Sequence, residues 1–444
     1  MRIAKWSIAA ASAVLVLSGA AGAEKLTSVR EKALADIRGG VPLTIERCVE
    51  LALADNPSLR ASRENARATE RGVLESYATF LPTVGASYDA SRTRVGFSEY
   101  QLSGNREYDS HQIGFGVNQT LFSFSGIKSI QQARNNKKSD LAGYEADEQT
   151  LIYQVRTACH DLLKMVDLLE VARENLGVGE GQLRLAEKRK EVGAGVTADV
   201  LKAKAHVESN LLDVITAEKN LAVARASLLA YLGLDVTLAV DVARPPDAEG
   251  ELPSFEESMK TAAENRPDLA EIEYALRASR DGVGAAWGEY TPTVGAGFSY
   301  GWRDTVLSGD IFDESRRSWS ARLSVDLPIF NVGTMSRIRQ QQARAESAKY
   351  GLEGTKKGIE FEVQEAILSI EESVKRIEVA TRNVAAAEED LRISQGKYEH
   401  GLVPILDLIE AQASLRQARA ARVEAVYDHL TSRAAWEKAV GRIR

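Results

Sequence analysis

The sequence PTVGA at residues 82–86 occurs again at residues 292–296, an offset of 210 residues. At the same offset, QQAR at residues 131–134 returns at residues 341–344. A repeat of this length is far longer than one unit of a solenoid. It predicts an old duplication that gives the chain two similar halves and a pseudo-two-fold protomer.

The N-terminus has the layout of a secretory signal peptide. Arg2 and Lys5 supply the positive start, residues 8–17 are mostly apolar, and residues 21–23 read AGA, a small-residue cleavage site. Ten apolar residues are too few to cross a bilayer as a helix. We therefore expect residues 1–23 to be removed on export.

The remaining chain divides into two repeats joined by a segment rich in proline and acid. We expect a first repeat at 24–240, a connection at 241–253 and a second repeat at 254–444. Each repeat begins with a short helix and a medium helix. A β-hairpin, a very long helix and a last helix then follow, at about 82–122, 127–190 and 197–232, and again at about 292–328, 335–398 and 404–440.

The predicted long helices carry a seven-residue repeat of large apolar side chains. In the second half the series is Val363, Ile370, Ile377, Val384 and Leu391. Small residues dominate the position three further on in each heptad. A period of 3.5 predicts left-handed supercoiling of closely packed helices.

Strict alternation marks the two hairpins as β-structure. In residues 294–302, five apolar side chains ending in Tyr300 and Trp302 are separated by glycine and serine. Period two, one apolar face and aromatic residues near the strand ends are typical of membrane β-strands. The alternative is a pair of soluble hairpins packed on the helices.

Four strands are too few to close a membrane barrel, and the open edges of a sheet cannot face lipid. In the membrane interpretation several protomers must therefore pool their strands. Three protomers would supply twelve strands around a water-filled lumen.

Several other functions find no support in the sequence. The net charge is -7 and no basic tract points to nucleic acid. The chain contains no phosphate-binding loop and no nucleophile elbow, and its five histidines lack metal-ligand spacing. We expect no enzyme activity, no cofactor and no metal. Cys48 and Cys159 lie in helical patterns and are predicted to be unpaired core residues.

The whole mature chain resembles the TolC family of outer-membrane efflux proteins. The resemblance rests on the duplicated order of elements and on Asn56-Pro57, Leu81-Pro82, Gly193…Asp199 and Gly401…Asp407. It implies a mainly α-helical fold with a β membrane part. In this fold a homotrimer forms a twelve-stranded barrel in the outer membrane, continuous with a helical tunnel in the periplasm. The short helices and the 241–253 connection would form a collar.

The resemblance also implies a function. The chain would be the passive exit duct of a tripartite efflux or type I secretion system, in contact with outer-membrane lipid and not with nucleic acid. An inner-membrane pump of the RND or ABC type would energise export through a periplasmic adaptor protein. The alternative is a structural coiled-coil protein of the periplasm. Drugs, metals and proteins all remain compatible as cargo.

Candidate gate residues lie at the predicted helix tips. Asp407 and Glu410 match the positions where the family places two acidic rings at the periplasmic entrance. Three copies of each would gather six carboxylates in a narrow mouth and favour cations. The alternative is local, because both residues follow Pro404 at a helix N-terminus and would stabilise the helix dipole.

The same resemblance assigns a gate tyrosine to Tyr398 and its acidic partner to Asp199, beside tip turns at Gly193 and Gly401. One position departs from the family pattern, because Val403 stands where an arginine is expected. The family's salt bridge from Asp199 to an arginine is therefore not expected at that position, and packing and Tyr398 are the alternative means of closure.

Overall fold

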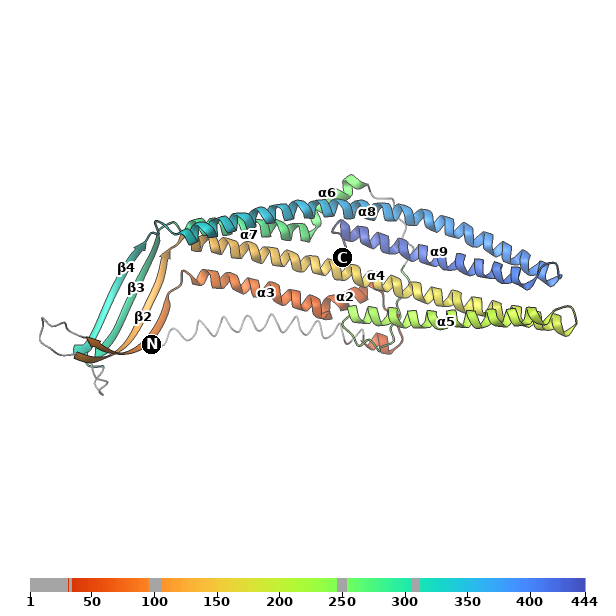
Figure 1. Ribbon diagram of the computed structural model, residues 1–444, viewed down its shortest axis with the longest axis horizontal. Helices are drawn as coiled ribbons and strands as arrows, with labels where there is room; N and C mark the ends of the chain where they lie inside the picture. Colours follow the sequence, from red (N-terminus) through yellow and green to blue (C-terminus); the bar gives the residue numbers. More distant parts are fainter. Residues whose placement is uncertain (1–30, 32–33, 96–105, 246–253, 305–311, 444) are drawn as a thin grey trace. The chain divides into compact units, whose positions relative to one another are not determined.

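The computed structural model describes residue 31 and residues 34–95, 106–245, 254–304 and 312–443 (Figure 1). The predicted signal peptide and most of the predicted connection lie outside these residues. The chain forms two compact units. The first, here called the helical unit, is Met1–Arg63, Tyr144–Pro267 and Lys356–Arg444; the second, the sheet unit, is Glu64–Gly143 and Asp268–Thr355.

Eight helices of the described residues fall into two matching sets. The first set is α2 (Ile45–Asp55), α3 (Pro57–Ala78), α4 (Phe124–Glu191) and α5 (Thr197–Tyr231). The second is α6 (Phe255–Asn265), α7 (Pro267–Gly288), α8 (Val332–Glu399) and α9 (Ile405–Ala439). Corresponding helices have the same lengths, 11, 22, 68 and 35 residues. None of these helices is long and apolar enough to cross a membrane.

The two short helices, α2 and α6, begin at residues that cap them with a hydroxyl group. The hydroxyl of Thr44 accepts a hydrogen bond from the N–H of Arg47 over 3.3 Å, which caps α2. The hydroxyl of Ser254, 210 residues later, caps α6 in the same way through the N–H of Glu257. Such caps satisfy N–H groups that have no partner inside the helix.

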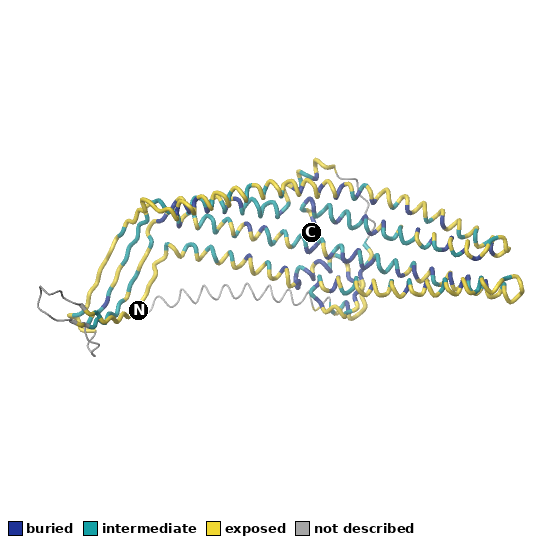
Figure 2. Tube along the Cα trace, viewed as in Figure 1, coloured by how far each residue is buried: buried dark blue, intermediate teal, exposed yellow. Residues whose placement is uncertain are grey.

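The heptad positions form the core of the helical unit. Val155, Leu162 and Leu169 of α4 are buried, and α5 contributes a second series with the same seven-residue spacing, Val214, Leu221 and Leu228. Figure 2 shows the buried residues gathered where α2, α4 and α5 pack together. Each large side chain removed from water in this way contributes about 1.5–3 kcal/mol to stability.

Asn56 ties three segments of the helical unit together. Its side-chain oxygen accepts hydrogen bonds from the N–H groups of Ser58 (2.9 Å) and Leu59 (3.1 Å) at the start of α3. Its amide nitrogen donates to the carbonyl of Tyr231 at the end of α5 over 2.9 Å. Arg266, its counterpart in the second half, donates to the carbonyl of Ala439 over 3.1 Å.

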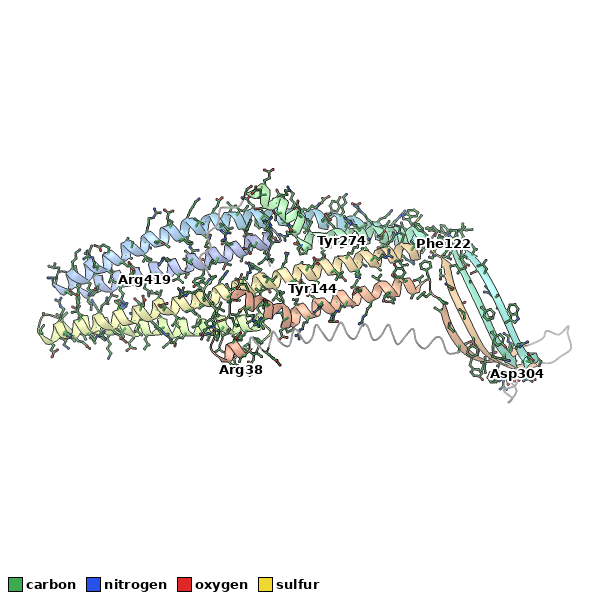
Figure 3. All side chains as sticks on the ribbon, turned by 180° about the vertical axis from the view of Figure 1, so that it is seen from behind. Arg38, Phe122, Tyr144, Tyr274, Asp304 and Arg419 are labelled. Atoms are coloured by element: carbon green, nitrogen blue, oxygen red, sulfur yellow. The ribbon has the colours of Figure 1, made fainter. Side chains whose placement is uncertain are left out.

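The sheet unit contains one antiparallel sheet with the strand order β1-β2-β3-β4 (Figure 1). The strands are β1 (Thr83–Val95), β2 (Arg106–Phe122), β3 (Thr293–Asp304) and β4 (Arg317–Asp326). Phe122 lies at the end of the sheet that leads into α4, and Asp304 lies at the opposite end (Figure 3). Between them, β2 of the first hairpin pairs directly with β3 of the second.

The register gives this sheet one apolar face and one polar face. Tyr88 pairs with Ile113, Phe115 with Tyr300, and Tyr300 with Trp319. The apolar face is formed by Val84, Ala86, Tyr88, Ala90, Ile113, Phe115, Val117, Ala296, Phe298, Tyr300, Trp302, Trp319, Ala321, Leu323 and Val325. Glycine, serine, threonine, asparagine and a few charged residues occupy the other face. The predicted fold class, mainly α-helical with four strands per chain, is confirmed.

The substitution Asn56→Ala tests the junction that Asn56 makes. It removes a helix cap and leaves buried polar groups without partners, which costs about 1–3 kcal/mol. We expect a lower midpoint of thermal unfolding, measured by circular dichroism in detergent. Asn65→Ala, on the exposed side of α3, is the control and should change stability by less than about 0.5 kcal/mol. Equal shifts in both variants would show that Asn56 has no special role.

Candidate functional site

Each of the two long helices ends in a turn, and the two turns are of the same kind (Figure 1). At the end of α4 the N–H groups of Gly193 and Ala194 donate to carbonyls three and five residues earlier, over 3.0 and 2.8 Å. Gly401 and Leu402 make the same two bonds at the end of α8, both over 2.9 Å. Gly193 has φ 77° and Gly401 has φ 74°, the left-handed conformation that favours glycine. Each turn reverses the chain into the next helix.

Tyr398 lies in the last turn of α8 and is 2% exposed. Its ring belongs to a small apolar cluster at the tips of the hairpins, which also contains Ala186, Ala203, Ile405 and Leu408. These residues come from α4, α5 and α9. The cluster therefore joins the α4–α5 hairpin to the α8–α9 hairpin within one chain.

Arg189, near the end of α4, connects the hairpins through a second type of contact. Its guanidinium donates hydrogen bonds to the carbonyls of Tyr398 and, over 3.1 Å, Glu399 at the end of α8. It also lies over the Tyr398 ring, 4.9 Å from the ring centroid. A cation at the C-terminal end of a helix is favoured by the exposed carbonyls there. Arg189 thus binds the end of α8 as well as its tyrosine.

Gly401 provides the room for this guanidinium. A Cβ atom at position 401 would lie 3.1 Å from Nη2 of Arg189. The glycine suits the left-handed backbone conformation of the turn, and its missing side chain leaves space for the arginine.

Asp199 lies in the first turn of α5 and is half-buried. Burial raises the pKa of Tyr398, and the negative charge of Asp199 raises it further, while Arg189 acts in the opposite direction. The phenol therefore stays neutral at physiological pH. The tips of the hairpins bring together the candidate residues that the sequence predicts, namely Tyr398, Asp199 and the two glycine turns.

Asp407 and Glu410 lie at the start of α9 with exposed side chains. Residues three apart share one side of a helix. Ile405 and Leu408, between and beside them, face the buried cluster instead. The two carboxylates thus form an acidic pair on the open side of α9, and Asp407 also lies in the first helical turn, where the helix dipole favours it.

A buried polar cluster forms a further connection between the hairpins, away from the tips. Asn175 of α4 donates to Oδ1 of Asn210 of α5 over 2.9 Å. Gln412 of α9 donates to both the carbonyl and Oδ1 of Asn175, over 2.8 and 2.9 Å. His206 donates to Oε1 of Gln412 over 3.3 Å. Buried polar networks of this kind fix the register of packed helices when every group is satisfied.

Gly179 makes space for that cluster. A Cβ atom there would lie 2.7 Å from the side-chain amide of Asn210. Gly179 thus allows a close contact between α4 and α5. The structure also records no cluster of histidine, cysteine or carboxylate side chains able to hold a metal among its described residues.

The sequence does not predict the role of Arg189, because the family resemblance places an arginine on the second hairpin, at the position of Val403. The relevant cation instead comes from the first hairpin and binds backbone carbonyls. Its only sequence signal is the run of basic residues in the last turn of α4, Lys188, Arg189 and Lys190. That run predicts a helix C-terminus but not a contact with α8.

Comparison with known proteins agrees with this architecture. The family model described as "Outer membrane efflux protein" matches residues 48–234 and 259–442. Outer membrane efflux protein BepC of Brucella suis is 24% identical over 403 residues, 90% of this chain and 86% of that protein. Outer membrane protein OprJ of Pseudomonas aeruginosa is 28% identical over 389 residues, 84% and 79% of the two chains.

Solved structures show the same fold. The outer membrane channel CmeC of Campylobacter jejuni superimposes with a TM-score of 0.80 at 17% identity, covering 90% of this chain and 85% of that one. Fold and family together define a channel-forming protein of the outer membrane rather than an enzyme. The chain belongs to the outer membrane efflux protein family. The predicted location, in the outer membrane with a helical tunnel in the periplasm, is confirmed.

The substitution Arg189→Ala tests the contact between the hairpins. Loss of charge-assisted hydrogen bonds costs about 1.5–3 kcal/mol, and 1.4 kcal/mol corresponds to about tenfold in an equilibrium. We expect backbone amides at residues 394–402 to exchange with deuterium about tenfold faster or more, measured by mass spectrometry.

Arg184→Ala is the matched control. Arg184 lies on the same helix and is paired only with Glu180, over 3.9 Å, on the exposed surface. Its replacement should leave exchange at residues 394–402 unchanged, because exposed pairs contribute little. Unchanged exchange in Arg189→Ala would show that packing alone holds Tyr398.

Proposed function

We propose that three copies of this chain form a trimeric channel with a twelve-stranded barrel, the passive exit duct of a tripartite export system. An inner-membrane pump energises transport through a periplasmic adaptor protein. Efflux is the favoured task, since relatives carry the printed names of antibiotic and toluene efflux pump outer membrane proteins. Secretion of protein is the second candidate, supported by the relative named alkaline protease secretion protein AprF.

The four-stranded sheet is the observation that carries this proposal. In the chain β1 pairs only with β2, and β4 pairs only with β3, so each end of the sheet has an edge without a partner among the described strands. In hydrocarbon every backbone N–H and C=O group needs a partner. Pairing β4 of one copy with β1 of the next satisfies both edges, and three copies close the ring.

The two faces of the sheet fit the two sides of a barrel wall. The apolar face carries exposed Val84, Trp319 and Leu323, which are 75%, 67% and 70% exposed in the single chain. A soluble hairpin would cover so large an apolar surface. The opposite face, rich in glycine and serine, is suited to a water-filled lumen.

Charged residues appear on the apolar face only at the hairpin end. Arg92 pairs with Asp109 over 2.9 Å, and Arg94 pairs with Glu107 over 3.8 Å. The apolar part of this face, from Val84 to Ala90, extends about 20 Å along β1, or about 15 Å along the axis of a barrel whose strands tilt by about 40°. In this proposal the ion pairs lie toward one edge of the apolar band, which is about 25 Å tall.

The acidic pair on α9 supplies the entrance of the proposed duct. We assign Asp407 and Glu410 to the periplasmic entrance, where three copies of each form two acidic rings. Tyr398, Asp199 and the turns at Gly193 and Gly401 hold these helix tips in place. Family membership favours this duct over a structural coiled-coil protein of the periplasm.

The substitution Leu323→Arg tests the channel proposal. Wild-type protein is expected in the outer-membrane fraction as a heat-modifiable trimer that requires detergent. An arginine at the lipid-facing midplane costs about 2–4 kcal/mol per copy, so the trimer yield should fall sharply. The yield of trimer is measured by native mass spectrometry of detergent extracts.

Ser320→Arg is the control, because Ser320 lies on the polar face of the same strand. It should give trimers in normal yield, since its side chain enters a lumen. A freely soluble monomer of the wild-type protein would refute the proposal. Equal loss in both variants would refute the assignment of the faces.

The variant Asp407→Asn/Glu410→Gln tests the acidic rings. Removal of six carboxylates per trimer should shift the cation-to-anion permeability ratio toward unity in planar bilayers, because the field at the mouth weakens. Glu353→Gln/Glu372→Gln removes the same charge from exposed positions on α8 and should leave the ratio unchanged. A ratio that is unaltered in the first variant would contradict the ring assignment.

A further inference from the structure

The only two cysteines of the chain meet in the core of the helical unit. Cys48 lies on α2 and Cys159 lies near the middle of α4. Both side chains are 0% exposed, and both belong to the same buried cluster. Both are free thiols in this structure. What the sequence does not predict is their proximity, because the two positions lie far apart along the chain.

The two thiols are neighbours in this cluster. The thiol of Cys48 lies within hydrogen-bonding reach of the thiol of Cys159. That contact and burial raise the pKa of Cys159 well above its ordinary value, so it carries no thiolate at physiological pH. A buried neutral thiol is a poor nucleophile. Once the chain has folded, these sulfur atoms are both unreactive and out of reach of solvent.

The compartment argues for oxidation before folding is complete. A protein of the outer membrane reaches its place through the periplasm, where disulfides form and persist. Before the helices of this core have packed, both thiols are open to solvent. The native fold then places the two sulfur atoms against each other, which selects this pairing.

We propose that Cys48 and Cys159 form a structural disulfide in the exported protein. In this step one cysteine, as a thiolate, attacks the disulfide of a thiol oxidant of the cell envelope and forms a mixed disulfide. The second cysteine then displaces the oxidant. One S–S bond forms in the chain, each cysteine loses its proton, and the two electrons reduce the disulfide of the oxidant to a dithiol.

The disulfide would close a loop of roughly 110 residues, which contains α3, β1, β2 and the first half of α4. Cross-links over long loops restrict the unfolded chain most in the chain-entropy model. In this protein the loop includes the first membrane hairpin. The bond therefore attaches α2 to α4 on either side of the segment that must enter the bilayer.

Thiol counting on the wild-type protein tests the proposal directly. Cells are quenched in acid, the denatured protein is treated with a polymer-linked maleimide, and the mass added to the chain is read on a gel. We expect no labelled thiol before reduction and two labelled thiols after it. Two labelled thiols before reduction would overturn the proposal.

Single variants show whether the bond is within one chain. Cys48→Ala and Cys159→Ala should each expose one labelled thiol without reduction. Unreduced wild-type monomer, once boiled, should migrate faster than reduced monomer because its loop is closed, and a cross-linked dimer would count against the proposal. The double variant Cys48→Ala/Cys159→Ala should show a thermal unfolding midpoint that no longer responds to reductant, whereas the wild-type midpoint falls.

Discussion

The backbone of a sheet in hydrocarbon must find a partner for every N–H and C=O group, and this chain supplies a sheet with two open edges. Much of the architecture depends on that constraint. In the proposed trimer the sheet is completed by other copies, with β4 of one copy beside β1 of the next. The corresponding helices of the two halves have equal lengths, 68 and 68 residues for the long pair, as a duplicated chain requires.

Within the chain, the two helical hairpins are joined by contacts of different kinds. At the tips, Arg189 binds the end of α8 and lies over the ring of Tyr398. Farther along the helices, Gln412 and Asn175 join α9 to α4 through buried hydrogen bonds. Apolar heptads would tolerate sliding by one whole heptad, about two helical turns, whereas these directional contacts would not. Together they hold the hairpins in a single register.

Much of the fold can be predicted from the sequence, because periodicity encodes it locally. The period of 3.5 predicts the long helices, the period of two predicts the strands, and the repeat at 82–86 and 292–296 predicts the duplicated order. Tyr398 and the glycine turns could be found because their neighbours in sequence form a motif. Arg189 could not, since its partner lies 210 residues away and is a backbone carbonyl. The meeting of Cys48 with Cys159 and of Asn175 with Gln412 likewise depends on packing between helices that no local pattern specifies.

The uninterrupted length of α4 restricts how the protein can change over time. Each residue added to an α-helix turns everything beyond it by about 100°. One residue inserted between Leu169 and Arg189 would therefore carry the arginine off the end of α8, even though no contact residue had been altered. Insertions and deletions should therefore be excluded from the long helices, which should vary by substitution alone. The lengths of the long helices therefore constrain both halves of the chain in the same way.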